Sequence, residues 1–290
     1  MKAPAFFLIN FLLFANAGNS QDQNNYQWPS ISADGSKLLY SKYGKSFGDI
    51  CLEVLDLETQ KVSKLLCDPV LEPEWSPDGS QILFVDTLNN FFVYDVKSKT
   101  RKQILSSEKM QGIQTPSWSF DGSKIYFGAG KFPMISIHCL DLAAGKSTPI
   151  TTDSSFNYGP AIAKNGKSLV YRHVDLKNKT NRGIWQLDLT TRSEKRLTEI
   201  GEYPTWSADG EFVYFQGKSR PDQKAGIYRV KRDGTQLTRL TSEDTISEWP
   251  VASRDGKIIY FTAKDTNDLW KIYSMNPDGS NLKAVSIPGY

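Results

Sequence analysis

A few residues in this chain have the types and spacing that enzyme chemistry uses. Residues 44–48 (GKSFG) match the G-x-S-x-G pattern of a serine nucleophile. That pattern works where a strand precedes it, a helix follows it, and Asp and His partners come later in the chain. Here it falls between two predicted strands with no helical pattern after it. We therefore interpret it as a flexible Gly/Ser loop.

Metal ligands are scarce as well. The chain has two histidines, His138 and His173, which fall in different predicted strands. A catalytic metal usually takes several His or carboxylate ligands that converge on one point. The segment 265–268 (DTND) could offer oxygens to calcium, but it lacks the spacing and the distal Glu of a calcium loop. We predict no catalytic residues, no metal site and no cofactor.

The first 17 residues have the features of a secretory signal peptide. Lys2 precedes an apolar run at 5–14, and Ala15 and Ala17 are the small residues of a cleavage site. A spanning helix needs about 20 apolar residues, so we expect no stable membrane insertion. The mature chain would then begin near Gly18 and lie in the periplasm or outside the cell.

Charge excludes another class of partner. The chain has 35 Lys and Arg against 32 Asp and Glu, so it carries little net charge. Nucleic-acid binding normally needs a strongly basic face, and we predict no nucleic-acid partner. Aromatic residues make up 12% of the chain, and they recur at fixed intervals.

A proline followed five residues later by Asp-Gly or Asn-Gly occurs six times. The spacings between successive prolines are 44, 43, 44, 44 and 46 residues. Internal repeats of this length are typical of propellers and solenoids. The six prolines are Pro29, Pro73, Pro116, Pro160, Pro204 and Pro250.

Each repeat has the pattern of four short strands. In the second repeat, Pro73 opens a first strand, and Pro77 to Gly79 form a turn. Apolar segments at 81–85 and 91–96 and a polar segment at 101–105 follow. Four strands per 40–45 residues, repeated radially, predict an all-β, six-bladed β-propeller of four-stranded antiparallel blades. It would occupy residues 18–290, with blades starting near residues 28, 72, 115, 159, 203 and 249.

These repeats resemble the TolB-type WD-like propeller family. The resemblance rests on residues 75–79 (WSPDG), 118–122 (WSFDG) and 206–210 (WSADG), and on Leu-Thr pairs at 197–198 and 240–241. Ile31, Ile162 and Ala252 depart from it by replacing the tryptophan. TolB also carries an N-terminal α/β domain, for which we expect no room before the first repeat. We therefore do not carry TolB's own role in the envelope over to this chain.

The favoured function is that of a noncatalytic, monomeric binding module with a protein or peptide partner in the cell envelope or outside the cell. Loops on a rigid scaffold are where binding concentrates. The alternative is a propeller enzyme, a metal-dependent lyase or a hydrolase, that acts on polysaccharide at the channel mouth.

Candidate binding residues come from the segments just before each repeat proline, which we expect to be loops. These segments differ between blades, whereas the Pro and Gly positions do not. Aromatic side chains are enriched at binding hot spots, and carboxylates could orient a basic group of the partner. The candidates are Trp28, Glu72, Tyr158, Glu202, Tyr203, Glu248 and Trp249.

A further prediction concerns how the ring of blades closes. We predict that each repeat forms one whole blade and that blade six packs directly on blade one.

The cysteines give a separate prediction. Cys51 and Cys67 lie eight residues to either side of Thr59, so a symmetric hairpin would place them opposite each other, near disulfide distance. A register shift of one residue would instead put them on opposite faces. Cys139 would remain a buried free thiol.

Overall fold

A computed structural model describes residues 25–44, 49–178 and 180–288, and all of its regular structure is β-strand. The strands form six four-stranded antiparallel sheets, so the predicted six-bladed propeller is confirmed. The predicted signal peptide and most of the GKSFG segment lie outside the described residues. Within the described part, no helix has the length and apolar character to cross a bilayer.

Each blade takes its four strands from one consecutive stretch. The first blade contains β1 (Asn25–Ile31), β2 (Lys37–Tyr43), β3 (Ile50–Asp56) and β4 (Val62–Leu66). The second contains β5 (Val70–Trp75), β6 (Gln81–Asp86), β7 (Phe91–Asp95) and β8 (Thr100–Leu105). The third contains β9 (Gln114–Trp118), β10 (Lys124–Ala129), β11 (Ser136–Asp141) and β12 (Lys146–Pro149).

The second half repeats this arrangement. The fourth blade contains β13 (Phe156–Ile162), β14 (Ser168–Val174), β15 (Arg182–Asp188) and β16 (Glu194–Thr198). The fifth contains β17 (Glu202–Trp206), β18 (Phe212–Gly217), β19 (Gly226–Lys231) and β20 (Thr238–Arg239). The sixth contains β21 (Ser247–Ala252), β22 (Ile259–Lys264), β23 (Trp270–Met275) and β24 (Lys283–Ala284).

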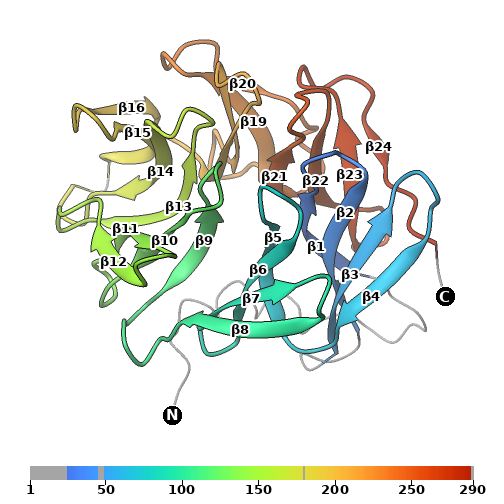
Figure 1. Cartoon of the computed structure of the whole chain (residues 1–290). Helices are drawn as coiled ribbons and strands as arrows, with labels where there is room; N and C mark the ends of the chain where they lie inside the picture. Colours follow the sequence, from blue (N-terminus) through green and yellow to red (C-terminus); the bar gives the residue numbers. More distant parts are fainter. Residues whose placement is uncertain (1–24, 45–48, 179, 289–290) are drawn as a thin grey trace.

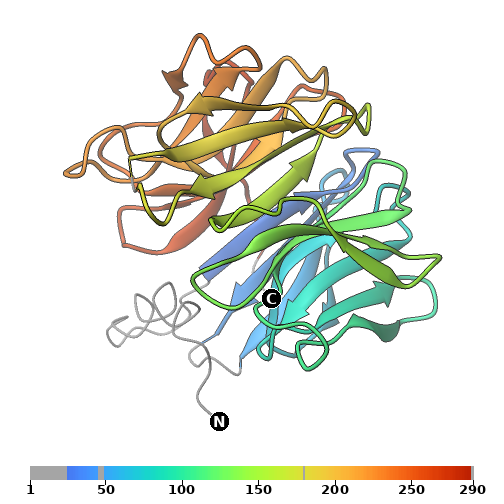
Figure 2. The same cartoon turned by 90° about the vertical axis from the view of Figure 1, so that its left-hand side faces the viewer.

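The first strand of each blade lies toward the middle of the ring, and the fourth lies at the rim (Figure 1). The blue-to-green blades of the N-terminal half lie beside the yellow-to-red blades of the C-terminal half (Figure 2). Blade six meets blade one through a shared apolar cluster that includes Tyr40 and Leu55 from one side and Tyr260 and Ile272 from the other. In the described residues, therefore, each repeat forms one whole blade, and the ring closes by packing.

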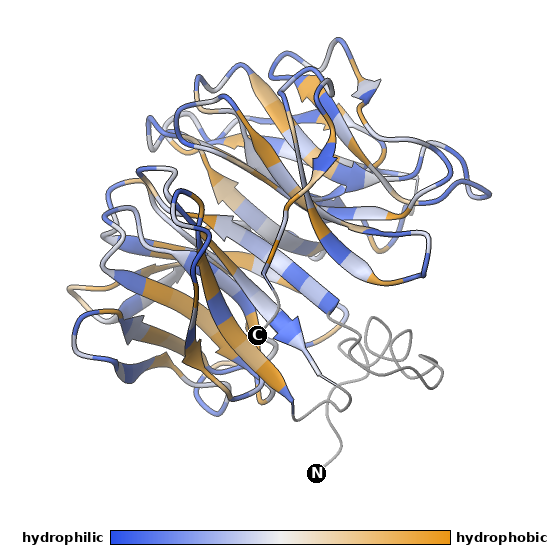
Figure 3. Cartoon of the chain, turned by 90° about the vertical axis from the view of Figure 1, so that its right-hand side faces the viewer, coloured by the Kyte–Doolittle hydropathy of each residue, from blue (hydrophilic) through white to orange (hydrophobic). Residues whose placement is uncertain are grey.

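The hydrophobic core lies between the blades. Trp75 packs with residues of blades one and two, and Trp206 with residues of blades four and five. Trp75, Trp118 and Trp206 are all buried. Apolar residues are concentrated in the strands, whereas the connecting turns are largely hydrophilic (Figure 3). Each blade thus needs both neighbours to bury its two faces, which is why the repeats must form a ring.

The Asp-Gly turns fix one face of the disc. In the first blade, Ser32 Oγ donates to Asp34 Oδ1 over 2.6 Å, and Ser36 N donates to the same oxygen over 3.0 Å. These hydrogen bonds lower the pKa of Asp34 to about 2, because they stabilise the charged carboxylate. Asn165 replaces the aspartate in blade four, and its Oδ1 still accepts from Lys167 N over 2.9 Å. We call this side the turn face and the opposite side the entry face.

Cys51 and Cys67 are joined by a disulfide in the first blade, and Cys139 is a buried free thiol. A β-bulge shifts the β3–β4 register between Leu52 and Glu53, so that Leu52 lies opposite Leu66. Continuing that register by one residue places Cys51 opposite Cys67. The bulge thus decides between the two alignments that the sequence left open.

Removing the disulfide should destabilise the fold. A cross-link that closes a loop of about 15 residues stabilises a protein by about 3 kcal/mol, because it lowers the conformational entropy of the unfolded chain. The two cysteines are 16 residues apart. The double variant Cys51→Ala, Cys67→Ala should therefore lose about 2–3 kcal/mol of unfolding free energy in urea titrations.

The control is the wild-type protein with and without a reducing agent. Reduction should lower the unfolding free energy of the wild type by the same amount and leave that of the double variant unchanged. If mass spectrometry of non-reduced peptides found both thiols free in protein purified from an oxidising compartment, the disulfide would be rejected.

Candidate binding site in the central channel

A β-bulge interrupts the innermost strand of every blade at its repeat proline. At each bulge, two residues of the inner strand oppose one residue of the second strand, as Glu72 and Pro73 oppose Phe84 in blade two. The residue before each proline has a positive φ of 49–60°. These residues are Trp28, Glu72, Thr115, Gly159, Tyr203 and Trp249.

This geometry corrects one prediction. The sequence analysis placed the residues before each proline in loops, because a proline suits the start of a strand. The structure instead places Trp28, Glu72 and Trp249 inside the inner strands β1, β5 and β21. The missing N–H of the proline falls at the bulge, where the ladder is already broken, so the strand continues through it.

The bulges also hold adjacent blades together. The backbone N–H of Thr115 donates to Glu72 Oε2 over 3.0 Å, and that of Gly159 donates to Thr115 Oγ1 over 3.0 Å. One step further along the strands, Trp118 N donates to Glu74 Oε2 over 3.2 Å. β9 and β13 are edge strands of their sheets, and a side chain of the preceding blade accepts from each of these amides.

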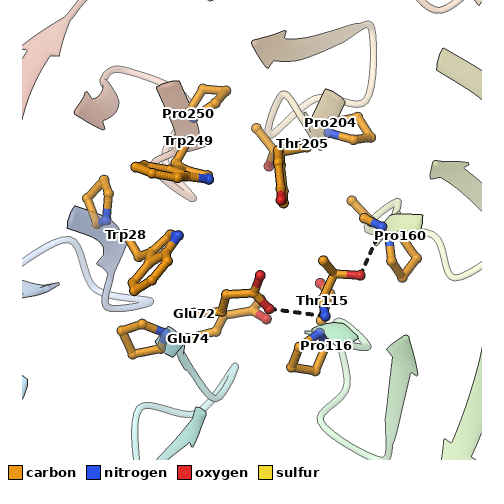
Figure 4. A pocket seen from close by; sticks show the side chains of 16 residues that line it. Trp28, Glu72, Glu74, Thr115, Pro116, Pro160, Pro204, Thr205, Trp249 and Pro250 are labelled. Carbon is orange, nitrogen blue, oxygen red and sulfur yellow. Dashed lines mark hydrogen bonds between the residues drawn. The ribbon is translucent and has the colours of Figure 1, made fainter. Parts of the chain in front are cut away.

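The inner strands enclose a cavity of about 170 Å³ on the ring axis. Trp28 and Trp249 form one wall, with ring centroids 5.4 Å apart, and Glu72 and Glu74 project from blade two (Figure 4). The two glutamates are the charged side chains of this lining, and the six prolines, Thr115 and Thr205 supply much of the remainder. The site is therefore an acidic, partly aromatic channel.

Both channel carboxyls bind protons more tightly than usual. Burial raises the pKa of Glu72 to about 7, although the hydrogen bond from Thr115 N opposes the shift. Burial likewise raises the pKa of Glu74 to about 8, opposed by Trp118 N and by the charge of Arg254. Near neutral pH these groups can exchange a proton or bind a cation at small free-energy cost.

A second cavity of about 170 Å³ continues the channel toward the turn face and shares Glu74 and Thr205 with the first. Arg254 lies over the Phe120 ring, with its guanidinium carbon 4.6 Å from the centroid, and Lys164 Nζ lies 5.4 Å from the same centroid. These cation–π contacts place two positive charges in the lining at the turn face. In the described part of the chain, the first cavity, which Glu72 lines, has no basic side chain in its lining.

Six of the seven candidate residues line one of two cavities, and the seventh, Tyr158, lines neither of them. Trp28, Glu72, Tyr203 and Trp249 line the axial cavity. A separate cavity of about 260 Å³ on the entry face is lined in part by Glu202 and Glu248. Tyr158 is buried, with its ring 4.9 Å from that of Phe156 and 5.8 Å from that of Tyr203.

Sequence reasoning missed Glu74, which follows the repeat proline. The equivalent residues of the other blades are uncharged: Ser30, Ser117, Ala161, Thr205 and Val251. This contrast was visible in the repeats and would have identified Glu74 as exceptional. Arg172 and Lys218, which line the same cavity as Glu202, were also missed; Arg172 comes from blade four and reaches this cavity through the packing of blade four on blade five.

The two histidines lie in different blades. His138 Nδ1 lies 3.5 Å from Ser147 Oγ in blade three, and His173 Nδ1 lies 2.8 Å from Asn157 Oδ1 in blade four. In the described residues, no three His, Cys, Asp or Glu side chains are grouped as metal ligands would be. Asp268 of the DTND segment forms an ion pair with Lys264 at 2.7 Å.

Comparison with known families bears on this geometry. The family model described as the TolB beta propeller domain matches residues 20–223. The chain belongs to the TolB β-propeller family. Its relative in Francisella tularensis, the Tol-Pal system protein TolB, is 30% identical over 98 residues. That match covers 33% of this TolB-type propeller and only 22% of the Francisella protein.

Solved structures agree on the fold. The putative TolB from Agrobacterium tumefaciens has a TM-score of 0.70 and 22% identity, over 81% of this TolB-type propeller and 87% of that chain. An oligogalacturonate lyase in complex with manganese has a TM-score of 0.65 and 17% identity, over 91% of this chain and 77% of that one. At such identities the likeness extends to the architecture alone.

The channel carboxyls should make stability fall as pH rises. Their folded pKa values, about 7 and about 8, lie above the unfolded value of 4.5. The folded protein therefore binds the protons more tightly, and the stability they contribute is lost as pH rises from 4.5 through the folded values. The double variant Glu72→Gln, Glu74→Gln keeps the acceptor oxygens but has no titrating carboxyl at these positions, so its stability should not show this decrease with pH.

Urea unfolding at about pH 5 and about pH 8 measures the effect. Between these values, the wild type should lose about 6 kcal/mol of unfolding free energy relative to the double variant, roughly 2.5 kcal/mol through Glu72 and roughly 3.5 kcal/mol through Glu74. Glu211→Gln, an exposed change in blade five, is the matched control and should follow the wild type. Parallel pH profiles for the wild type and the double variant would contradict the assigned pKa values.

Proposed function

We propose that this chain is a noncatalytic, exported binding module of the periplasm or the extracellular space, and that a protein or peptide partner docks at its entry face over the axial cavity. The observation that carries the proposal is the lining of that cavity. The repeat prolines are constant, whereas the residues before them vary from blade to blade and project into the channel. Family membership supports a TolB-like scaffold.

The aromatic wall suits a peptide contact. Trp28 lies 5.9 Å from Tyr43 and 5.4 Å from Trp249 between ring centroids, and Trp249 lies 5.8 Å from Trp270. This row of rings is held rigidly by its own packing. Rigid aromatic side chains provide large contact area at a small cost in conformational entropy, so they are common at hot spots.

The carboxyls select the chemistry of the partner. Glu72 and Glu74 project into the channel from blade two, next to Trp28 of blade one (Figure 4). A lysine side chain or a free amino terminus that entered there would meet carboxylates and, beside them, the face of an aromatic ring. Both favour a cation, and a bound cation would lower the pKa of each carboxyl.

A polysaccharide-acting enzyme is the second candidate, because of those same two carboxyls. Titratable groups with raised pKa values in a cleft are candidates for general acid or base catalysis. The fold likeness to oligogalacturonate lyase adds no residue-level support at 17% identity. Incubation of purified protein with acidic and neutral polysaccharides, read by reducing-end release, separates the two functions. Turnover that Glu72→Gln abolishes would replace the binding proposal.

The binding proposal is tested by capture of envelope proteins on the immobilised mature chain. A partner identified by mass spectrometry should bind Trp28→Ala and Trp249→Ala more weakly by about 1–2 kcal/mol or more each, because each change removes part of the aromatic wall. Glu72→Gln should weaken binding of a partner that inserts a cationic group.

Leu88→Ala is the surface control, since Leu88 is an exposed apolar residue 69% accessible to solvent and outside the cavity lining. Circular dichroism must show that every variant is folded. Unchanged affinity in the three channel variants would place the partner's site elsewhere on the disc.

A further inference from the structure

The entry face has a second cavity, of about 260 Å³, that is separate from the channel. Its walls come from blades four, five and six, and none of its lining residues lines the axial cavity. One water needs about 10–15 Å³ of such space, so the cavity can hold a small organic molecule. Most of its lining is charged: Arg172, Arg182, Glu199, Glu202, Lys218 and Glu248.

Two carboxylates stand side by side in this cavity. Glu202 and Glu248 hold the same repeat position in blades five and six, and Gln27, Leu71, Gln114 and Tyr158 hold it elsewhere. Burial and the charge of Glu202 raise the pKa of Glu248 to about 7, against the opposing charges of Lys218 and Lys264. A cationic group placed between the two carboxylates would relieve their repulsion.

Glu202 is also held in place by its neighbours. Its charge and a hydrogen bond contribute to raising the pKa of the Tyr158 hydroxyl, which Arg172 opposes. Arg172 is buried, and its Nη1 donates to the carbonyl oxygen of Gly201 over 2.9 Å. Gln216, paired with Glu202 across β17 and β18, accepts from Trp249 N over 2.8 Å. The acidic side of the cavity is therefore ordered before any ligand arrives.

Basic groups complete the lining. Among the ion pairs formed by the described residues, none engages Arg182 or Lys218, whereas Glu199 is paired with Arg196 at 3.1 Å and Lys264 with Asp268. Two cations are thus available to an anionic group, and Ile200 and Ala225 add apolar surface. The lining offers complementary charges to both ends of a zwitterion.

We propose that this off-axis cavity binds a small zwitterion with a free amino group and a free carboxylate, of about the size of a dipeptide. The amino group lies between Glu202 and Glu248, and the carboxylate faces Lys218 and Arg182. The site is independent of the channel partner, and it would persist if that partner bound elsewhere. It differs from a simple cation site because it requires both ends of the ligand.

Calorimetric titration of the mature chain with three probes of nearly equal size tests the proposal. Glycyl-leucine carries both charged ends, N-acetyl-glycyl-leucine lacks the amino group, and glycyl-leucinamide lacks the carboxylate. Glycyl-leucine should bind with a dissociation constant of about 1 mM or lower. Each of the other two should bind about tenfold more weakly or worse, because a hydrogen bond to a charged group is lost.

Two variants identify which residues bind the amino end of the dipeptide and which bind its carboxylate end. Glu248→Gln should weaken glycyl-leucine and glycyl-leucinamide alike, because both carry the amino group. Lys218→Met should weaken glycyl-leucine about tenfold and leave the amide unchanged. Glu211→Gln is the matched control on the surface of blade five. Trp28→Ala should leave dipeptide binding intact, which separates this site from the channel.

Lys218 lies after the end of β18, so Lys218→Met tests the proposal even if a change at Glu248 disturbs the fold. The proposal is overturned if glycyl-leucine shows no binding at about 10 mM, tenfold above the expected constant. It is equally overturned if the three probes bind alike, or if neither Glu248→Gln nor Lys218→Met changes the affinity.

Discussion

The left-handed residue before each repeat proline is the constraint on which this propeller depends. A non-glycine residue with positive φ costs about 1–3 kcal/mol, and the β-branched Thr115 is an unusual occupant. The conformation persists because it redirects a backbone N–H toward the preceding blade, as from Thr115 to Glu72. The free-energy cost of this backbone conformation is offset by hydrogen bonds between adjacent blades. These bonds hold the inner strands around one axis.

The same bulge explains why the channel can be varied without loss of the fold. At two blade boundaries the amide two residues after the repeat proline also donates to the preceding blade, and a hydroxyl is a sufficient acceptor: Ser30 Oγ accepts from Trp75 N over 3.1 Å. Blade two uses Glu74 at the equivalent position, where Trp118 N donates to a buried carboxyl. A serine would satisfy the amide without the desolvation that raises the pKa of Glu74. Folding therefore does not require a carboxyl at either position, which is the physical reason to propose that Glu72 and Glu74 contact a ligand.

Sequence alone was sufficient for the features that local chemistry determines. The spacing of Pro73 and the Asp78-Gly79 turn predicted the blades, because a proline and a positive-φ glycine have few alternative positions. It was insufficient where a bulge changes the direction of the chain. Trp28 was expected in a loop and lies within β1, and the grouping of Glu202 with Arg172 depends on contacts between blades. No periodic pattern in a single strand encodes those contacts.

The bulges also account for two cavities built from consecutive residues. Tyr203 lines the channel while Glu202, its neighbour, lines the off-axis cavity, and Trp249 and Glu248 divide in the same way. Alternation in a strand already separates adjacent side chains onto opposite faces, and the left-handed residue turns one of them toward the axis. A carboxylate next to an aromatic residue therefore belongs to a different site from its neighbour. The aromatic member can contact a partner on the axis while the acidic member contacts a small ligand beside it.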